Sequence, residues 1–162
     1  MTQFANTPGI PKEVADKLFA AGVSFLSNKA FSSAYVCFDR IPAKDFKLLY
    51  NKALCCFMVE WYDECHRLLC EAERLVPMNA GHGTERLPEA FIHYLHDEES
   101  PFCPISQGTP EPLAYTRLLR LKAEAAFKQH LYGEVKAISF RLGGKYKHIE
   151  TLINTSCNND DQ

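Results

Sequence analysis

Apolar residues recur along this chain with the spacing of an α-helix. They return every three or four positions, which gathers them on one face of a helix. Alternation of apolar and polar residues, the pattern of a half-buried strand, is almost absent. The pattern predicts helices over 12–27, 31–41, 46–59, 62–76, 113–127 and 135–142. A short helix over 88–97 and a final helix over about 145–155 complete an all-α fold.

The longer helices fall into pairs that repeat one another. The first helix of each pair carries a small residue at one matching position: Gly22, Ala53 or Ala123. Nine residues later, just after the predicted turn, comes an aromatic residue: Phe31, Tyr62 or Tyr132. The second helices then match at three more positions: Ala34, Cys65 and Val135; Phe38, Leu69 and Ser139; Ile41, Ala72 and Leu142. Recurrence at a spacing of 31 and then 70 residues indicates internal repeats.

This pattern resembles the tetratricopeptide repeat, in which a small residue lies where the two helices of a hairpin cross closely. The second repeat fits best and has the exit proline, Pro77, whereas the third lacks it and has Ser139 at an apolar position. The resemblance implies a short α-solenoid of about three hairpins within a single domain, 1–162. The expected parts are repeats at about 15–45, 46–79 and 116–148, an insert at 80–112, and a capping helix at about 145–155 that covers the last repeat.

The insert is rich in glycine and proline and interrupts the repeats. It reads either as a functional loop or as a degraded repeat that still fills the stack. His82, His93, His96 and Cys103 lie in it and have the chemistry of zinc ligands, but their spacing lacks the close pairs of structural zinc sites. We therefore expect no metal and no other cofactor. Because no catalytic motif is present, we expect no enzyme either, and a metal- or thiol-dependent activity in the insert is kept as an alternative.

Composition narrows the class of protein further. A net charge of −2 lacks the basic excess of nucleic-acid-binding proteins. No apolar run approaches the roughly 20 residues that span a membrane, so we expect no membrane insertion. The N-terminal residues lack the features of a secretory signal, and the seven cysteines are odd in number and irregularly spaced. These features predict free thiols in a cytoplasmic protein.

The resemblance implies that the first helix of each pair lines a concave face. In the first helix, Leu18, Gly22 and Phe25 account for the stacking core, so that a second apolar stripe is left over. A helix that is apolar on two faces must bury both. We expect this surplus face to bind a protein or peptide partner. The predicted partner-binding residues are Phe19, Val23, Leu26, Tyr50, Leu54, Phe57, Arg117, Arg120 and Lys128.

The predicted groove runs from apolar to basic, which suits a helix or extended peptide with apolar anchors and an acidic end. If instead residues 87–96 or the last helix fill the groove, Tyr50 and Phe57 become core residues. The carboxylate clamp of chaperone-binding family members is not expected, because only Asn51 and Arg117 match its five positions. The predicted function is an adaptor-like or co-chaperone-like interaction module, with a secretion-type chaperone for an apolar client segment as an alternative.

Overall fold

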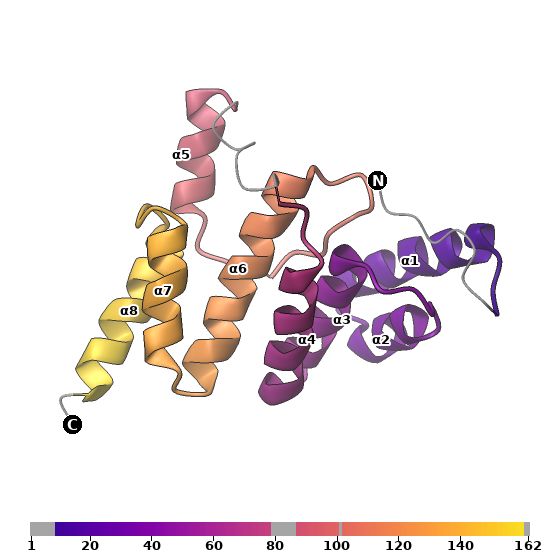
Figure 1. Cartoon of the computed structure of the whole chain (residues 1–162), viewed down its shortest axis with the longest axis horizontal. Helices are drawn as coiled ribbons and strands as arrows, with labels where there is room; N and C mark the ends of the chain where they lie inside the picture. The colour runs from indigo at the N-terminus through magenta and orange to yellow at the C-terminus, as the bar shows by residue number, and fades with distance from the viewer. Residues whose placement is uncertain (1–8, 79–86, 101, 161–162) are drawn as a thin grey trace. The chain divides into compact units, whose positions relative to one another are not determined.

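The computed structural model describes residues 9–78, 87–100 and 102–160, and the regular elements among them are all α-helices (Figure 1). The all-α prediction is therefore confirmed. The helices of the described residues are α1 Lys12–Ser27, α2 Phe31–Asp39, α3 Phe46–Met58, α4 Tyr62–Arg74, α5 Glu89–Asp97, α6 Glu111–Lys128, α7 Tyr132–Arg141 and α8 Lys147–Asp160.

These helices form two compact units. The first holds α1 to α4 together with the segment Cys103–Pro110, and the second holds α5 to α8. In the first unit α1 packs on α2, α2 on α3, and α3 on α4; in the second, α6 packs on α7, and α8 packs on α5, α6 and α7. Two of the three predicted hairpins thus lie in the first unit and the third in the second. The predicted insert 80–112 is divided, because Cys103–Pro110 packs with the first unit.

The three hairpins turn in the same way. Lys29, Glu60 and His130 lie seven residues after the three small residues, and each has a positive φ, at 61°, 66° and 62°. In each turn the next amide donates to a carbonyl five residues back, at 2.8 Å in all three, which is the αL helix ending known as a Schellman motif. The residue that donates this bond, Ala30, Trp61 or Leu131, then precedes the second helix. One turn geometry therefore repeats at the spacing that the sequence pattern indicated.

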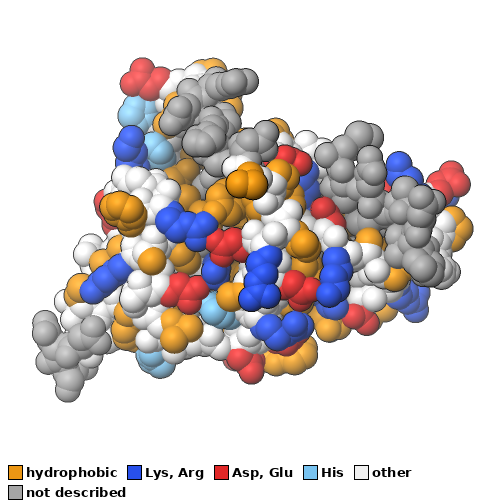
Figure 2. Space-filling model, viewed as in Figure 1, with side chains coloured by type: hydrophobic (Ala, Val, Ile, Leu, Met, Phe, Trp, Pro, Cys, Tyr) orange, Lys and Arg blue, Asp and Glu red, His pale blue; other side chains and the backbone are white. Residues whose placement is uncertain are grey.

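The surface carries charges of both signs. On the face drawn in Figure 2, Lys and Arg side chains lie among Asp and Glu side chains rather than in one basic patch. Among the helices that the structure describes, none combines the length and hydropathy needed to cross a membrane.

Candidate functional site

Helix α3 is buried along almost its whole length, and three of its buried residues are polar. Eleven of its 13 residues are buried, and they include Lys47, Tyr50 and Asn51. The helix begins at an N-cap, Asp45, whose carboxylate accepts hydrogen bonds from the amides of Lys47 and Leu48. Burial raises the pKa of this carboxyl group, and the two amide hydrogen bonds act in the opposite direction. Buried polar side chains need partners, so the groups that these three residues contact define the site.

Their partner is the segment Cys103–Pro110, which we call the strap. The Asn51 amide makes two hydrogen bonds to the main chain of Ile105: its Nδ2 donates to the carbonyl at 2.7 Å, and its Oδ1 accepts from the N–H at 2.8 Å. The Tyr50 hydroxyl donates to the carbonyl of Cys103 at 2.8 Å. These contacts join residues more than 50 positions apart in the sequence.

Lys47 extends the same pattern. Its ammonium group donates to the carbonyls of Gln107 at 2.8 Å and Thr109 at 2.6 Å, and the residue is only 4% exposed. A cation in the first turn of a helix meets the positive end of the helix dipole. The two carbonyl dipoles offset this unfavourable position. From Cys103 to Thr109, the carbonyl of every second residue thus accepts a hydrogen bond from a side chain of α3.

In this site the side chains of α3 bond to main-chain atoms of the strap, and one strap side chain, that of Ile105, is buried. Ile105 is fully buried, as are Tyr50 and Asn51. The strap is also tied to α1, because the Gln107 amide donates to the Asp16 carboxylate at 3.3 Å. The arrangement is that of a short peptide held against a helix by its backbone and anchored by one apolar residue.

The predicted surplus stripe of α1 is in fact its core face. The buried residues of α1 are Ala15, Phe19, Gly22 and Leu26, and the ring of Phe19 packs edge-on against Phe38 at 5.8 Å between centroids. Phe25, which the sequence assigned to the core, is 40% exposed. The two stripes are therefore exchanged. The argument that Phe19 and Leu26 need a partner is wrong, since α2 already covers Phe19.

The other apolar residues of the predicted groove are also buried. Tyr50, Leu54 and Phe57 are 0%, 1% and 7% exposed, whereas Val23 is half-buried. The Tyr50 hydroxyl is held by the strap, and the ring of Phe57 packs edge-on against Tyr62 at 5.1 Å. Within the first unit, the strap contacts Tyr50. Of these residues, Tyr50 therefore belongs to a site that the chain itself occupies.

The predicted basic end of the groove lies in the second unit. Arg117 is half-buried and Lys128 is exposed. Arg120 is one of the predicted partner-binding residues, but it is only 1% exposed. Its guanidinium donates to the Glu98 carboxylate at 3.0 Å and to the carbonyl of Glu98, and it lies 5.4 Å from the centre of the Tyr146 ring. Arg120 is therefore a buried structural charge, because Glu98 neutralises it within the unit.

The described histidines and cysteine of the predicted insert are divided between the two units. His82 lies outside the described residues, His93 and His96 belong to the second unit, and Cys103 belongs to the first. Cys103 enters the site through its carbonyl group.

Three thiols of α3 and α4, those of Cys55, Cys56 and Cys65, are buried. Burial raises the pKa of Cys55 to about 12 and that of Cys56 to about 11, and it raises the pKa of Cys65 as well. A thiol is nucleophilic as its thiolate, so these three side chains behave as small apolar residues.

The sequence placed Tyr50 in the site but missed the role of its two polar neighbours. Asn51 matches one position of the carboxylate clamp, but neither Lys47 nor Asn51 is among the predicted partner-binding residues. The available signal was the presence of Lys47 and Asn51 within a mostly apolar helix, since polar residues that are buried there need a partner.

No protein-family model, no curated protein and no solved structure matches this chain.

Proposed function

We propose that the protein is a peptide-binding interaction module, in which a partner segment takes the place of the strap against α3. The observation that carries this proposal is the pair of hydrogen bonds between the Asn51 amide and the main chain of Ile105. A side-chain amide that bonds both the N–H and the C=O of one residue can hold any residue except proline. A segment of another protein can make the same contacts.

The strap supplies the chemistry expected of the partner. Tyr50, Asn51 and Lys47 contact main-chain atoms, so they set the path of the bound segment with little demand on its sequence. Specificity comes from the buried position of Ile105, which suits a branched apolar side chain. The proposed partner is therefore a short irregular segment with one aliphatic anchor. The tetratricopeptide resemblance agrees with this role, because it implies the use of the first helix of a hairpin as a binding surface.

Covalent attachment makes the strap a strong competitor. A tethered segment meets its site at an effective concentration in the millimolar range, so a free peptide of equal intrinsic affinity binds weakly to the intact chain. The apparent affinity falls with the fraction of molecules whose site is open. Weakening the strap is thus expected to strengthen binding of a peptide in trans.

The test uses a fluorescent synthetic peptide with the sequence of residues 102–110, in which serine replaces the cysteine. In the full chain, Ile105→Asp puts a charge at the buried position of the strap, which weakens the contact of the strap with α3. This variant is expected to bind the peptide at least about tenfold more tightly than the unmodified chain does. Adding Asn51→Leu to this variant removes both amide hydrogen bonds at similar side-chain volume, and it is expected to abolish the increase in peptide affinity. The matched control is Asn154→Leu, at an exposed position in α8, which is expected to leave the increased affinity unchanged.

Two results would overturn the proposal. One is a folded Ile105→Asp variant, with its helical circular dichroism retained, that binds no peptide. The other is equal binding by the Asn51→Leu and Asn154→Leu forms. Either result would make the strap a fixed part of the core.

A further inference from the structure

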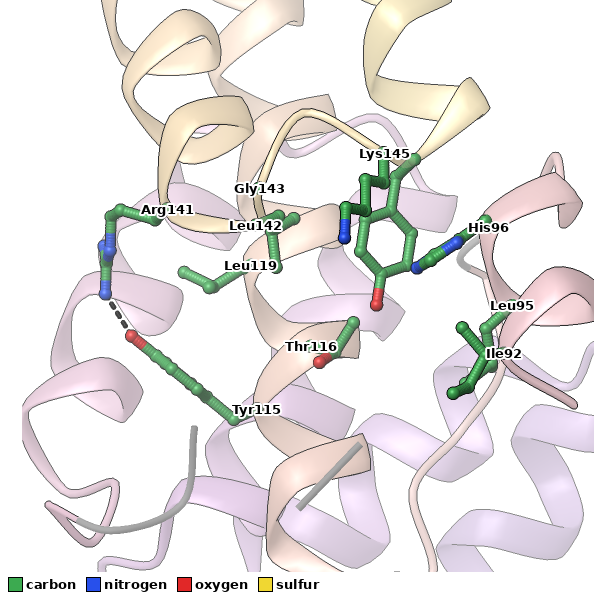
Figure 3. A pocket seen from close by; sticks show the side chains of 11 residues that line it. Ile92, Leu95, His96, Tyr115, Thr116, Leu119, Arg141, Leu142, Gly143 and Lys145 are labelled. Carbon is green, nitrogen blue, oxygen red and sulfur yellow. Dashed lines mark hydrogen bonds between the residues drawn. The ribbon is translucent and has the colours of Figure 1, made fainter. Parts of the chain in front are cut away.

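Each of the two units contains a pocket, and the two pockets differ in character. The pocket of the second unit, about 530 Å³ in volume, has polar groups that lie far apart (Figure 3). Its Arg141 guanidinium donates a hydrogen bond to the Tyr115 hydroxyl on one side, and His96 lies on the other side. The charged groups of this pocket therefore do not converge on one point. The pocket of the first unit is smaller, about 260 Å³, and its lining is uniform.

This smaller pocket lies between α2 and the last residues of α3. Its lining residues are Phe31, Ser32, Tyr35 and Val36 from α2, Cys55 and Cys56 from α3, and Val59 and Trp61 from the turn that follows. Of these described residues, three are aromatic and none is charged. The pocket is separate from the strap, whose partners lie in the first half of α3.

The pocket has a buried floor, Cys55 and Cys56, and an exposed rim, Val36, Val59 and Trp61. The two cysteines are 2% and 1% exposed, whereas the three rim residues are 48%, 56% and 48% exposed. Burial raises the pKa of both thiols, so the floor carries no charge at neutral pH. Large apolar side chains that stay half-exposed around a hollow are typical of a binding surface.

The hairpin turn fixes the backbone of Trp61 at the rim. Its N–H donates to the carbonyl of Cys56 at 2.8 Å, and its carbonyl accepts from the N–H of Cys65 at 3.1 Å. Glu60, just before it, has the left-handed φ that ends α3. The indole ring is therefore carried by an ordered backbone, which lowers the entropy that a ligand must remove on binding.

The charged side chains near the pocket are already paired. Lys52 lies 5.4 Å from the centre of the Tyr35 ring, and its ammonium group contacts the Asp39 carboxylate at 2.9 Å. Glu64 and Arg67, whose charges also reach the floor, are paired with each other. An ionised ligand in the pocket would lose hydration without gaining an opposite charge. The surroundings therefore favour an uncharged ligand.

The volume and the rings indicate the kind of ligand. A cavity of roughly 150 Å³ holds benzene, so a pocket of about 260 Å³ has room for a molecule of two fused rings. Phe31, Tyr35 and Trp61 offer ring-to-ring contacts, which add to the gain from burying apolar area. We propose that this pocket binds a small uncharged aromatic molecule against the thiols of Cys55 and Cys56. The site does not depend on the strap or on peptide binding in its place.

Trp61 is the only tryptophan of the chain, so its indole N–H gives a single signal in the spectrum of the isotopically labelled protein. The probe is 2-naphthylmethanol, which is expected to shift this signal and the amide signals of Val36 and Val59. The ligands 2-naphthoate and 2-naphthylmethylammonium share its ring system but carry a charge, and each is expected to bind at least about tenfold more weakly. The saturated alcohol decahydro-2-naphthylmethanol lacks the aromatic rings and is also expected to bind more weakly.

Val36→Lys places an ammonium group at the rim and is expected to change the preference for charge. This variant is expected to bind 2-naphthylmethanol more weakly than the unmodified chain does, and to bind 2-naphthoate more tightly, because the carboxylate gains a charged donor. Val14→Lys is the matched control, since Val14 is 42% exposed in α1 and does not line the pocket. It is expected to leave both affinities unchanged.

The proposal is overturned if 2-naphthylmethanol at millimolar concentration leaves the Trp61 indole signal in place. It is equally overturned if either charged ligand or the saturated alcohol binds the unmodified chain as tightly as 2-naphthylmethanol does, or if Val14→Lys alters binding as Val36→Lys does. A Trp61 indole signal that shifts with protein concentration alone would show that a second copy of the chain covers the pocket, which would also contradict the proposal.

Discussion

Gly22 of α1 lies so close to the ring of Phe38 of α2 that a Cβ atom at position 22 would be 2.5 Å from the ring carbon Cε1. Phe38 is 1% exposed, and its ring also packs against Phe19, so it has little room to move. This contact confirms the predicted close crossing of the first hairpin. It makes glycine a requirement of packing here, since the backbone angle at this position is an ordinary one.

We expect Gly22→Ala to destabilise the protein, although the same change in an open helix is stabilising. Overpacking in a filled core costs roughly 1–3 kcal/mol, which exceeds the gain of about 1 kcal/mol in helix propensity. Thermal or denaturant unfolding measures the difference. Gly133→Ala in α7 is the control, because no atom lies within 4 Å of its added Cβ, and it is expected to stabilise. A stabilising Gly22→Ala would contradict the described crossing.

The left-handed turn residues make a separate prediction. Glu60 is exposed and has a φ of 66°, a conformation that costs a residue with a side chain about 1–2 kcal/mol. Glu60→Gly relieves this strain, and the larger entropy of glycine in the unfolded chain offsets part of the gain. We expect a net stabilisation of up to about 1 kcal/mol in urea unfolding. The control is Lys136→Gly, at an exposed position inside α7, which is expected to destabilise the protein by a similar amount. If Glu60→Gly destabilises the protein as Lys136→Gly does, the left-handed turn at Glu60 is contradicted.

The Arg120–Glu98 pair predicts a pattern of coupling. Removing the carboxylate with Glu98→Ala leaves a guanidinium that is only 1% exposed without its counter-charge, which is expected to cost on the order of 3 kcal/mol. Adding Arg120→Met to that variant is expected to restore part of the stability, because no buried charge remains. Urea unfolding of the two single variants and the double variant measures the coupling. If the free-energy changes of the two single variants simply add up to that of the double variant, Arg120 and Glu98 do not stabilise the protein as a pair.

Thiol reactivity tests the burial of α3 and α4. At pH 8 the raised pKa values of Cys55 and Cys56 keep both side chains protonated and unreactive, whereas Cys157 is exposed in α8. Brief treatment with iodoacetamide, followed by peptide mass spectrometry, is expected to show modification of Cys157 well before that of Cys55, Cys56 or Cys65. All of these should react in denaturant. Modification of Cys55 in the folded protein as fast as that of Cys157 would contradict the packing.

The sequence predicted the helices well, because each depends on local periodicity. The range 12–27 is α1 without change, and the other helices differ from their predicted bounds by a few residues at their ends. Helix α7 begins at Tyr132, three residues earlier than expected, because the turn at His130 and Leu131 leads directly into it. Helix α8 continues to Asp160 through polar residues that carry no apolar signal.

The burial of the two apolar stripes on α1 could not be decided from the sequence. Successive residues are about 100° apart around a helix, so the Phe19 and Leu26 stripe and the Leu18 and Phe25 stripe are neighbours. Gly22 fits both of them. Which stripe faces α2 depends on the position of Phe38, and this is a tertiary relationship. The strap was missed for a related reason, since irregular residues have no periodicity and Ile105 meets Asn51 across 54 positions.

Amide exchange at Ile105 tests the central claim most directly. Its N–H is held by the fully buried Asn51 side chain, so it is expected to exchange slowly in the free chain. Adding the unlabelled 102–110 peptide at millimolar concentration is expected to speed this exchange in proportion to occupancy, because the peptide displaces the strap. The amide of Leu49, which donates to the carbonyl of the N-cap residue Asp45, is expected to stay protected. An Ile105 amide that remains equally protected at the highest peptide concentration would show that α3 does not exchange its strap for a partner.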